Sequence, residues 1–350
     1  MTSSQAQASA ADAVGRHQPV LLERCLDLLA PAIEGAADST TADRPARPLM
    51  IDCTLGMGGH TEAALERFPA LKVVGIDRDP EAIALASARL SRFGDRFIAV
   101  QATYDAVSRV AHEHSVRAEG TVDAVLMDLG VSSLQLDEAS RGFSYARPAP
   151  LDMRMDQGSG MTAQDLLEHA DAAELTRILR TYGEERFASR IAAAIVRRRE
   201  SGDPVTSTQD LAELVRQSVP APARRSGGHP AKRTFQALRI RVNGELDALE
   251  QMLPTALNAL EVGGRFAVLA YHSLEDRMVK RTFTEACSDH APARLPVVPP
   301  ELMAKFTPVT RKAVRPDPDE VEANPRAASA RLRIVERIRP GAVMSKERQR

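Results

Sequence analysis

Three carboxylates in this sequence each end a run of apolar residues, and the first of them stands just before a glycine-rich turn. They are Asp52, Asp77 and Asp128, and the turn covers residues 56–59. If the apolar runs are neighbouring parallel strands, their carboxyl ends meet at one edge of a sheet. A strand, a glycine turn and a helix N-terminus there can hold a polar ligand such as a nucleotide or nucleoside.

The spacing of the glycines argues against two common phosphate sites. A dinucleotide fingerprint needs Gly-x-Gly-x-x-Gly, but Gly56 and Gly58 are followed by Thr61 at the third position. No Gly-Lys pair occurs anywhere in the chain, which excludes a P-loop. A tight strand-to-helix turn without any ligand stays open as the alternative for this motif alone.

Two further residues indicate an adenine nucleoside. Asp77 lies about 20 residues beyond the glycines, where an acid can accept hydrogen bonds from both ribose hydroxyls. Its alternative role is to cap the next helix, but Asp79 followed by Pro80 already suits that role. Tyr104 follows a predicted strand, so its ring could lie against adenine, and a half-buried packing role fits its position equally. The predicted ligand lacks a pyrophosphate, and S-adenosylmethionine fits that description.

Asp128 follows the fourth predicted strand, next to the expected topological switch point of the sheet. A carboxylate there can accept a hydrogen bond from an exocyclic amine and align its lone pair with a methyl donor. Enzymes that methylate amines often have Asp-Pro-Pro-aromatic here, whereas this chain has Asp-Leu-Gly-Val, so a turn aspartate stays open. His272 follows a later strand at the same edge. It could face the substrate, or it could be an ordinary loop histidine. Ser273 beside it is as likely to cap the next helix as to take part in chemistry.

The elements that must position these residues follow from the apolar pattern. Strand and helix patterns alternate over 49–128, which predicts a parallel, doubly wound α/β sheet. Helical spacing over 162–179, 184–200 and 207–219, without any strand signal, indicates an inserted all-helical subdomain. The α/β pattern then resumes with a helix over 243–260.

Other segments carry weaker signals. We expect a first helix that ends near Leu29, a loop over 31–48, a proline-rich covering loop over 292–319 and a final antiparallel edge strand over 331–338. We expect four parts in the chain: a disordered tail over 1–15, a sheet domain over 16–136 and 241–339, a helical insertion over 137–240 and a basic tail over 340–350.

Composition limits the class of protein. No apolar run reaches the roughly 20 residues of a membrane span, and the three cysteines are too far apart for a zinc site or disulfide framework, which suits a reducing cytoplasm. The net charge is −1, yet basic residues are clustered, for example at 197–199 and 232–233. Solvated faces are the favoured interpretation on charge alone, and phosphate-binding patches are the alternative.

Eight motifs in this order resemble the RsmH (MraW) family of bacterial methyltransferases. They are the segments 51–60, 75–80, 127–133, 141–144, 150–156, 182–186, 233–237 and 272–277, and the resemblance covers about 17–338. It implies a Rossmann-like class I methyltransferase sheet with the helical insertion serving substrate recognition. It also implies methylation of N4 of a cytidine in the decoding region of 16S ribosomal RNA, within the small ribosomal subunit.

The resemblance also implies roles for single residues. The expected contacts to S-adenosylmethionine are Gly58, Gly59, His60, Asp77, Tyr104, Asp128 and Gln135. The family commonly has Phe at the position of Tyr104, a difference that keeps the ring. For this activity we expect catalysis by Asp128 with Ser132 and His272, and RNA contacts by Arg154, Arg197, Arg198 and Arg233. No metal is expected, and the oligomeric state is left open, with a homodimer among the choices.

Two other functions stay open from the sequence. A nucleotide-binding oxidoreductase would use the same fold, but the missing third glycine argues against it. A ribosome-assembly factor that binds RNA without catalysis would keep the fold and the basic patches.

Overall fold

The computed structural model describes residues 19–38, 47–224, 229–292 and 297–343. These residues form two compact units, one from those up to 130 together with those from 247 onward and the other from those between 131 and 246. The second unit is therefore longer at both ends than the expected insertion 137–240. The predicted tail 1–15 lies outside the described residues, as does most of the basic tail 340–350. No helix in the described ranges is long and apolar enough to cross a membrane.

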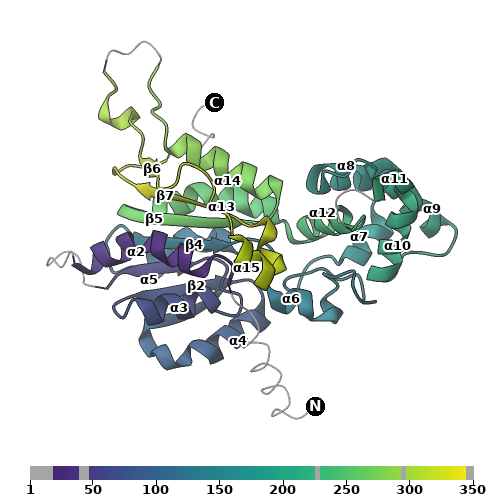
Figure 1. Ribbon diagram of the computed structural model, residues 1–350, viewed down its shortest axis with the longest axis horizontal. Helices are drawn as coiled ribbons and strands as arrows, with labels where there is room; N and C mark the ends of the chain where they lie inside the picture. Colours follow the sequence, from purple (N-terminus) through teal and green to yellow (C-terminus); the bar gives the residue numbers. More distant parts are fainter. Residues whose placement is uncertain (1–18, 39–46, 225–228, 293–296, 344–350) are drawn as a thin grey trace. The chain divides into compact units, whose positions relative to one another are not determined.

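The described part of the first unit contains a seven-stranded sheet in the order β3-β2-β1-β4-β5-β7-β6 (Figure 1). Its strands are β1 (Leu49–Asp52), β2 (Lys72–Asp77), β3 (Phe97–Gln101), β4 (Val122–Asp128), β5 (Leu260–Ala270), β6 (Phe306–Pro308) and β7 (Arg331–Arg337). Strands β1 to β5 are parallel, and β7 is antiparallel to both β5 and β6. The expected Rossmann-like sheet is confirmed, and its order reverses between β1 and β4, where ligands bind in such folds.

Helices cover the sheet because each strand presents apolar residues to both faces. The α-helices whose bounds fall mainly in this unit are α2 (Leu22–Asp38), α3 (Gly59–Arg67), α4 (Pro80–Leu90), α5 (Val107–His114), α13 (Glu245–Ala259), α14 (Ser273–Ala286) and α15 (Pro318–Ala323). On one face, Leu26 of α2 and Leu65 of α3 belong to one core with Leu126 of β4. On the other, Phe266 of β5 meets Phe283 of α14 edge to face at 5.4 Å.

Short 3₁₀ turns complete this unit: η1 (Ser91–Arg96), η2 (Tyr104–Ala106), η4 (Pro300–Leu302) and η5 (Pro325–Ser329). The expected Asp79 cap is confirmed, because its Oδ1 accepts from the backbone N–H of Glu81 at 3.1 Å and Pro80 begins α4. The helix through Pro254 is also confirmed, as α13.

The predicted end of the first helix near Leu29 is wrong, because α2 continues through Pro31 to Asp38. Proline removes one helical hydrogen bond. However, Ala32, Ile33 and Ala36 are buried beyond it, and Ile33 joins the core beneath the sheet. Burial of this face outweighs the lost bond. Residues 39–46 of the expected loop lie outside the described residues.

The last strand is antiparallel, as expected, but its predicted place at the sheet edge is wrong. β6 pairs with β7 on its outer side, with Phe306 opposite Arg337. A strand of three residues within a proline-rich segment has too little periodicity to be predicted. The segment 292–319 also contains η4 and the beginning of α15, and residues 293–296 lie outside the description.

The second unit is helical in its described residues. Its helices are α6 (Ser133–Asp137), α7 (Ala163–His169), α8 (Ala172–Gly183), α9 (Ala188–Glu200), α10 (Thr208–Ser218), α11 (Ala221–Arg224) and α12 (Lys232–Asn243), with the 3₁₀ turn η3 (Ala139–Arg141). The single helix expected over 162–179 is wrong, since Asp171 caps a new helix by accepting from Glu174 N at 2.7 Å. The helix α12 precedes α13, the helix expected over 243–260, and was not predicted from the sequence.

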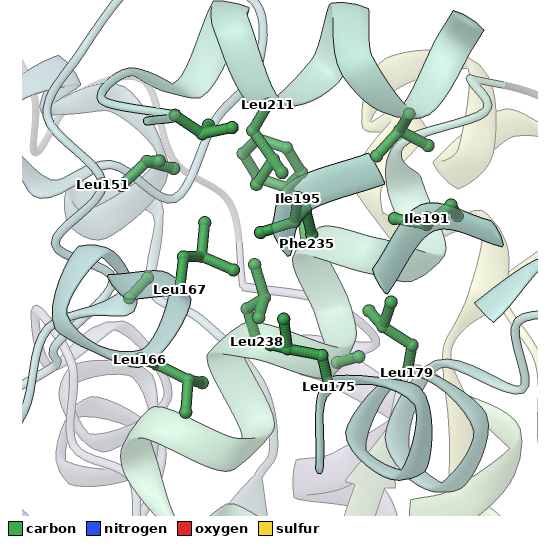
Figure 2. Packing of buried hydrophobic residues seen from close by; sticks show 14 of the residues in the cluster. Leu151, Leu166, Leu167, Leu175, Leu179, Ile191, Ile195, Leu211, Phe235 and Leu238 are labelled. Carbon is green, nitrogen blue, oxygen red and sulfur yellow. The ribbon is translucent and has the colours of Figure 1, made fainter. Parts of the chain in front are cut away.

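This unit has its own hydrophobic core, which Figure 2 shows around Phe235 and Leu238. Leu175 and Leu179 of α8 and Ile191 and Ile195 of α9 point into it together. The other residues of this core that Figure 2 labels are Leu151, Leu166, Leu167 and Leu211. The second unit therefore has a core of its own, separate from the core of the sheet unit.

Candidate functional site at the carboxyl ends of β1, β2 and β4

The two glycines at the start of α3 are required by close packing. Gly58 caps α3 with φ of 79°, and a Cβ there would lie 2.9 Å from Leu90 Cδ1. A Cβ on Gly59 would lie 2.6 Å from Pro19 Cγ. The turn therefore excludes side chains at both positions, and the N–H groups at the start of α3 are not covered by a side chain of the turn itself. Their contact with a cofactor stays a prediction.

Asp77, at the end of β2, is held against this turn. Its Oδ2 accepts from the backbone N–H of Gly56 at 2.8 Å, and its Oδ1 accepts from that of Asp79 at 2.9 Å. Burial raises the pKa of Asp77 above its usual value, and backbone hydrogen bonds from Asp79, Gly56 and Arg78 oppose that effect. A carboxylate has about four acceptor positions, so this group keeps capacity for a further donor.

A backbone hydrogen bond ties the segment just before Tyr104 to Asp77. The backbone N–H of Ala102 donates to the carbonyl of Asp77 at 2.9 Å, and Tyr104 begins η2 two residues later. Its side chain is half-buried. The structure thus places the start of η2 near the sheet edge where Asp77 ends β2, and the contact of the Tyr104 ring with adenine stays a prediction.

Asp128 is fixed at two points at the end of β4. Its backbone N–H donates to Thr54 Oγ1 at 2.6 Å, and its Oδ1 accepts from the Tyr271 hydroxyl at 2.7 Å. The side chain is 25% exposed. Burial raises the pKa of Asp128 to about 7, the Tyr271 hydrogen bond lowers it, and the charge of Glu275 raises it. This carboxyl therefore changes charge near neutral pH.

His60 faces the second oxygen of Asp128. Its Nε2 lies 3.2 Å from the carbonyl oxygen of Val20, and its Nδ1 lies 3.8 Å from Asp128 Oδ2. A carbonyl only accepts hydrogen bonds, so Nε2 carries the proton and Nδ1 carries a lone pair. Burial lowers the pKa of His60, which keeps the ring neutral.

Asp52 has a structural role between β1 and α3. It is fully buried, and its Oδ2 accepts from the Thr61 hydroxyl at 2.7 Å. Burial raises its pKa, and the Thr61 hydrogen bond opposes the shift. Thr61, the residue that replaces the third glycine, therefore locks the end of the strand to the first turn of the helix.

His272 caps α14, so the alternative of a cap by Ser273 is wrong. Its Nδ1 accepts from the backbone N–H of Glu275 at 3.4 Å, and Glu275 Oε2 accepts from the backbone N–H of His272 at 3.2 Å. Its Nε2 lies 3.0 Å from Glu275 Oε1, and the side chain is 10% exposed. This reciprocal cap gives His272 a structural function, and its catalytic role stays a prediction.

Ser132 and Gln135 form the corresponding cap of α6 in the second unit. Ser132 Oγ accepts from Gln135 N at 3.3 Å, and Gln135 Oε1 accepts from Ser132 N at 3.1 Å. Gln135 is buried. The cap accounts for this pair locally, and roles in cofactor binding and catalysis stay predictions.

Comparison with known proteins identifies the chain's relatives. A model of the MraW methylase family matches residues 15–338. The chain belongs to the MraW methylase family. A protein from Beutenbergia cavernae named ribosomal RNA small subunit methyltransferase H is 56% identical over 340 residues, covering 97% of this chain and 98% of that protein. A protein of the same name from Cutibacterium acnes is 52% identical over 338 residues, covering 95% and 96%.

The predicted RNA-contacting arginines of this MraW-family chain differ in what they already bind. Arg154 holds Asp152 through two hydrogen bonds of 2.8 and 2.9 Å, and Arg198 forms ion pairs with Asp203 and Asp210. The remaining two are exposed. Arg233 donates to the carbonyl of Glu184 at 3.0 Å, while Arg197 has no polar side-chain partner within the described ranges.

Sequence reasoning missed Tyr271, Thr54 and Glu275 as site residues of this MraW-family chain. The signal for Tyr271 is its place just beyond β5, the strand that pairs with β4, where Asp128 lies opposite Leu269. Thr54 carries no signal beyond its position after Asp52. Among the described residues no group of three or more His, Cys, Asp or Glu side chains is arranged to hold a metal ion.

Proposed function

We propose that this chain is an S-adenosylmethionine-dependent methyltransferase that acts on N4 of a cytidine in the decoding region of 16S ribosomal RNA. The observation that carries the proposal is the state of Asp128. One of its oxygens is bound by Tyr271, and the other, Oδ2, has no hydrogen-bond donor among the described residues. The relatives named as small-subunit RNA methyltransferases, matched over nearly their whole length, support the substrate class.

The cofactor site fits S-adenosylmethionine by its chemistry. A side chain at Gly58 or Gly59 would meet Leu90 or Pro19 at less than 3.0 Å, and Asp77 retains capacity to accept a further hydrogen bond. Ribose hydroxyls are donors that match such a carboxylate. We propose that Asp77 holds the ribose, that Tyr104 lies against the adenine, and that His60 and the glycine turn line the methionine side. S-adenosylmethionine, when bound, supplies a methyl group that is already strongly electrophilic.

Asp128 then orients the substrate. Its Oδ2 accepts a hydrogen bond from the N4 amine and directs the nitrogen lone pair along the line of transfer. As the new carbon–nitrogen bond forms and the carbon–sulfur bond breaks, one N4 proton must leave, and the Asp128 carboxylate accepts it. We include Ser132 and His272 as residues near the substrate, in addition to the caps they form.

RNA binding uses the exposed cations of the helical unit. Arg197 and Arg233 are the strongest of the four predicted residues, because their side chains are exposed. Arg190 lies seven residues before Arg197 in α9, so both project from one face of that helix, and it too is exposed. Such contacts give affinity without reading sequence. Because small ribosomal subunits are the substrate, the proposed location is the bacterial cytoplasm.

The test is mass-spectrometric mapping of 16S RNA after incubation of small subunits with protein and labelled S-adenosylmethionine. We expect one methyl group, on N4 of a single decoding-region cytidine. A label on another base would reject the N4 assignment. RNA binding without any label would support the assembly-factor alternative, and binding of NAD would support the oxidoreductase alternative.

A further inference from the structure

We propose that Tyr271 is a positioning residue for methyl transfer, because its hydroxyl binds Asp128 Oδ1 and leaves Oδ2 as the oxygen that receives the substrate amine. The inference rests on the proposed function. It goes beyond it by assigning different tasks to the two oxygens of one carboxylate.

The first support is the rigidity of Asp128. Its backbone is anchored by Thr54 at 2.6 Å and its side chain by Tyr271 at 2.7 Å. A hydroxyl-to-carboxylate bond of this length is charge-assisted and about twice as strong as a neutral one. The Tyr271 hydrogen bond therefore favours one orientation of the carboxylate, with Oδ1 toward Tyr271 and Oδ2 away from it.

The second support is that Tyr271 is itself anchored. Glu275 Oε2 accepts from the backbone N–H of Tyr271 at 2.9 Å, within the reciprocal cap that begins α14. Gly130, with φ of 104°, lies beside the ring, and a Cβ there would be 3.6 Å from Tyr271 Cδ2. The helix cap therefore holds the backbone of Tyr271, and the Tyr271 hydroxyl in turn holds Asp128 Oδ1.

The third support is the environment of Oδ2. The ring nitrogen of His60 that faces it is Nδ1, at 3.8 Å, which carries a lone pair because Nε2 donates to Val20. A lone pair offers no hydrogen to the oxygen. Within the described residues Oδ2 thus has an unused acceptor position, on a side chain that is one quarter exposed.

The charge of Asp128 depends on all its neighbours. Buried groups around it are Cys25 of α2, Asp52 of β1, His60 of α3, and Glu275 of α14. Burial raises the pKa of Asp128 to about 7, and only the Tyr271 hydrogen bond is a clear opposing influence. Burial and the charge of Asp128 raise the pKa of Tyr271 well above its usual value, so its hydroxyl stays protonated and keeps donating.

The experiment compares Tyr271→Phe with the wild type. The variant keeps the ring and loses one charge-assisted hydrogen bond, so we expect kcat to fall about 10- to 100-fold. The dissociation constant for S-adenosylmethionine and KM for RNA should stay within about 2-fold, since neither ligand is bound by this hydroxyl. Tyr182→Phe, which removes a hydroxyl in the helical unit, is the matched control and should leave kcat unchanged.

A second measurement does not depend on activity. The Asp128 carboxyl carbon is followed by NMR against pH in both proteins. We expect its pKa to rise above about 7 in Tyr271→Phe. An unchanged titration overturns the inference whatever the substrate, and so does an unchanged kcat in an active enzyme. An inactive wild type with a shifted titration rejects the proposed function and leaves the Tyr271–Asp128 coupling standing.

Discussion

The backbone N–H of Gly56 donates to Asp77 Oδ2 at 2.8 Å, so the glycine turn after β1 and the carboxylate that ends β2 form one structural unit. Two features predicted separately from the sequence are thereby joined directly. The hydrogen bond fixes the position of the carboxylate relative to the turn.

Replacement of Asp77 should remove cofactor binding. Asp77→Asn keeps the volume and one acceptor oxygen, but it loses the charge that would bind two ribose hydroxyls. Each such bond is worth about 1.5–3 kcal/mol, so we expect S-adenosylmethionine to bind at least about 100-fold more weakly by calorimetry. Asp79→Asn, which preserves the cap of α4, is the control. Unchanged affinity in Asp77→Asn would reject this site.

Activity should increase with pH because Asp128 must be ionised to accept the amine hydrogen bond. Burial raises its pKa to about 7, so the active carboxylate forms as pH passes through that value. We expect kcat/KM on RNA to rise between about pH 6 and 8 and then level off. Asp128→Asn should lose nearly all turnover, and any residual kcat/KM should no longer rise over this range of pH. A flat profile in the wild type would exclude Asp128 as the titrating group.

The same pKa shift should affect stability in the opposite sense. A carboxyl with a raised pKa in the folded state favours the fold while it is neutral, and that contribution is lost as pH rises through about 7. Because the pKa rises from 3.8 to about 7 on folding, the free energy of unfolding falls by at most about 4 kcal/mol over this range of pH. Asp128→Asn should therefore gain thermal stability relative to the wild type at pH 8 and not at pH 4. Equal differences at both values would contradict the shift.

Arg197 and Arg198 should separate RNA binding from folding. Arg197→Gln removes an exposed cation, so affinity for RNA should fall and the slope of log K against log salt should decrease by about 0.7, at constant melting temperature. Arg198→Gln breaks the ion pairs with Asp203 and Asp210 and should lower the melting temperature by about 2–4 °C. The reverse pattern in titrations and melting curves would show that Arg198, not Arg197, contacts RNA.

Gly58→Ala should destabilise the protein more than Gly244→Ala. Both glycines have left-handed helical backbone angles, which cost about 1–2 kcal/mol for alanine. At Gly58 the new Cβ also meets Leu90 Cδ1 at 2.9 Å, whereas nothing lies within 4 Å at Gly244. Denaturant unfolding of both variants measures the difference. Equal losses would mean that Leu90 moves aside freely.

The sequence by itself determined strands β1 to β4 and the edge of the sheet at which the proposed site lies. Continuous apolar runs and helices with capping residues are local patterns, so these strands and the Asp79 cap could be predicted. The carboxyl ends of parallel strands must then share one edge, which placed Asp77 and Asp128 there. The resemblance to a known family added the substrate class, and the match over 15–338 confirmed that family.

Only the tertiary structure decided which polar groups are already used. Arg197 and Arg198 are adjacent and alike in sequence, yet only Arg198 is held by Asp203 and Asp210. Likewise, the bond between Tyr271 and Asp128 joins residues 143 positions apart. The continuation of α2 through Pro31 also depended on burial against distant strands. Local sequence determines the elements, whereas the partners of a side chain are set by long-range packing, which no local pattern contains.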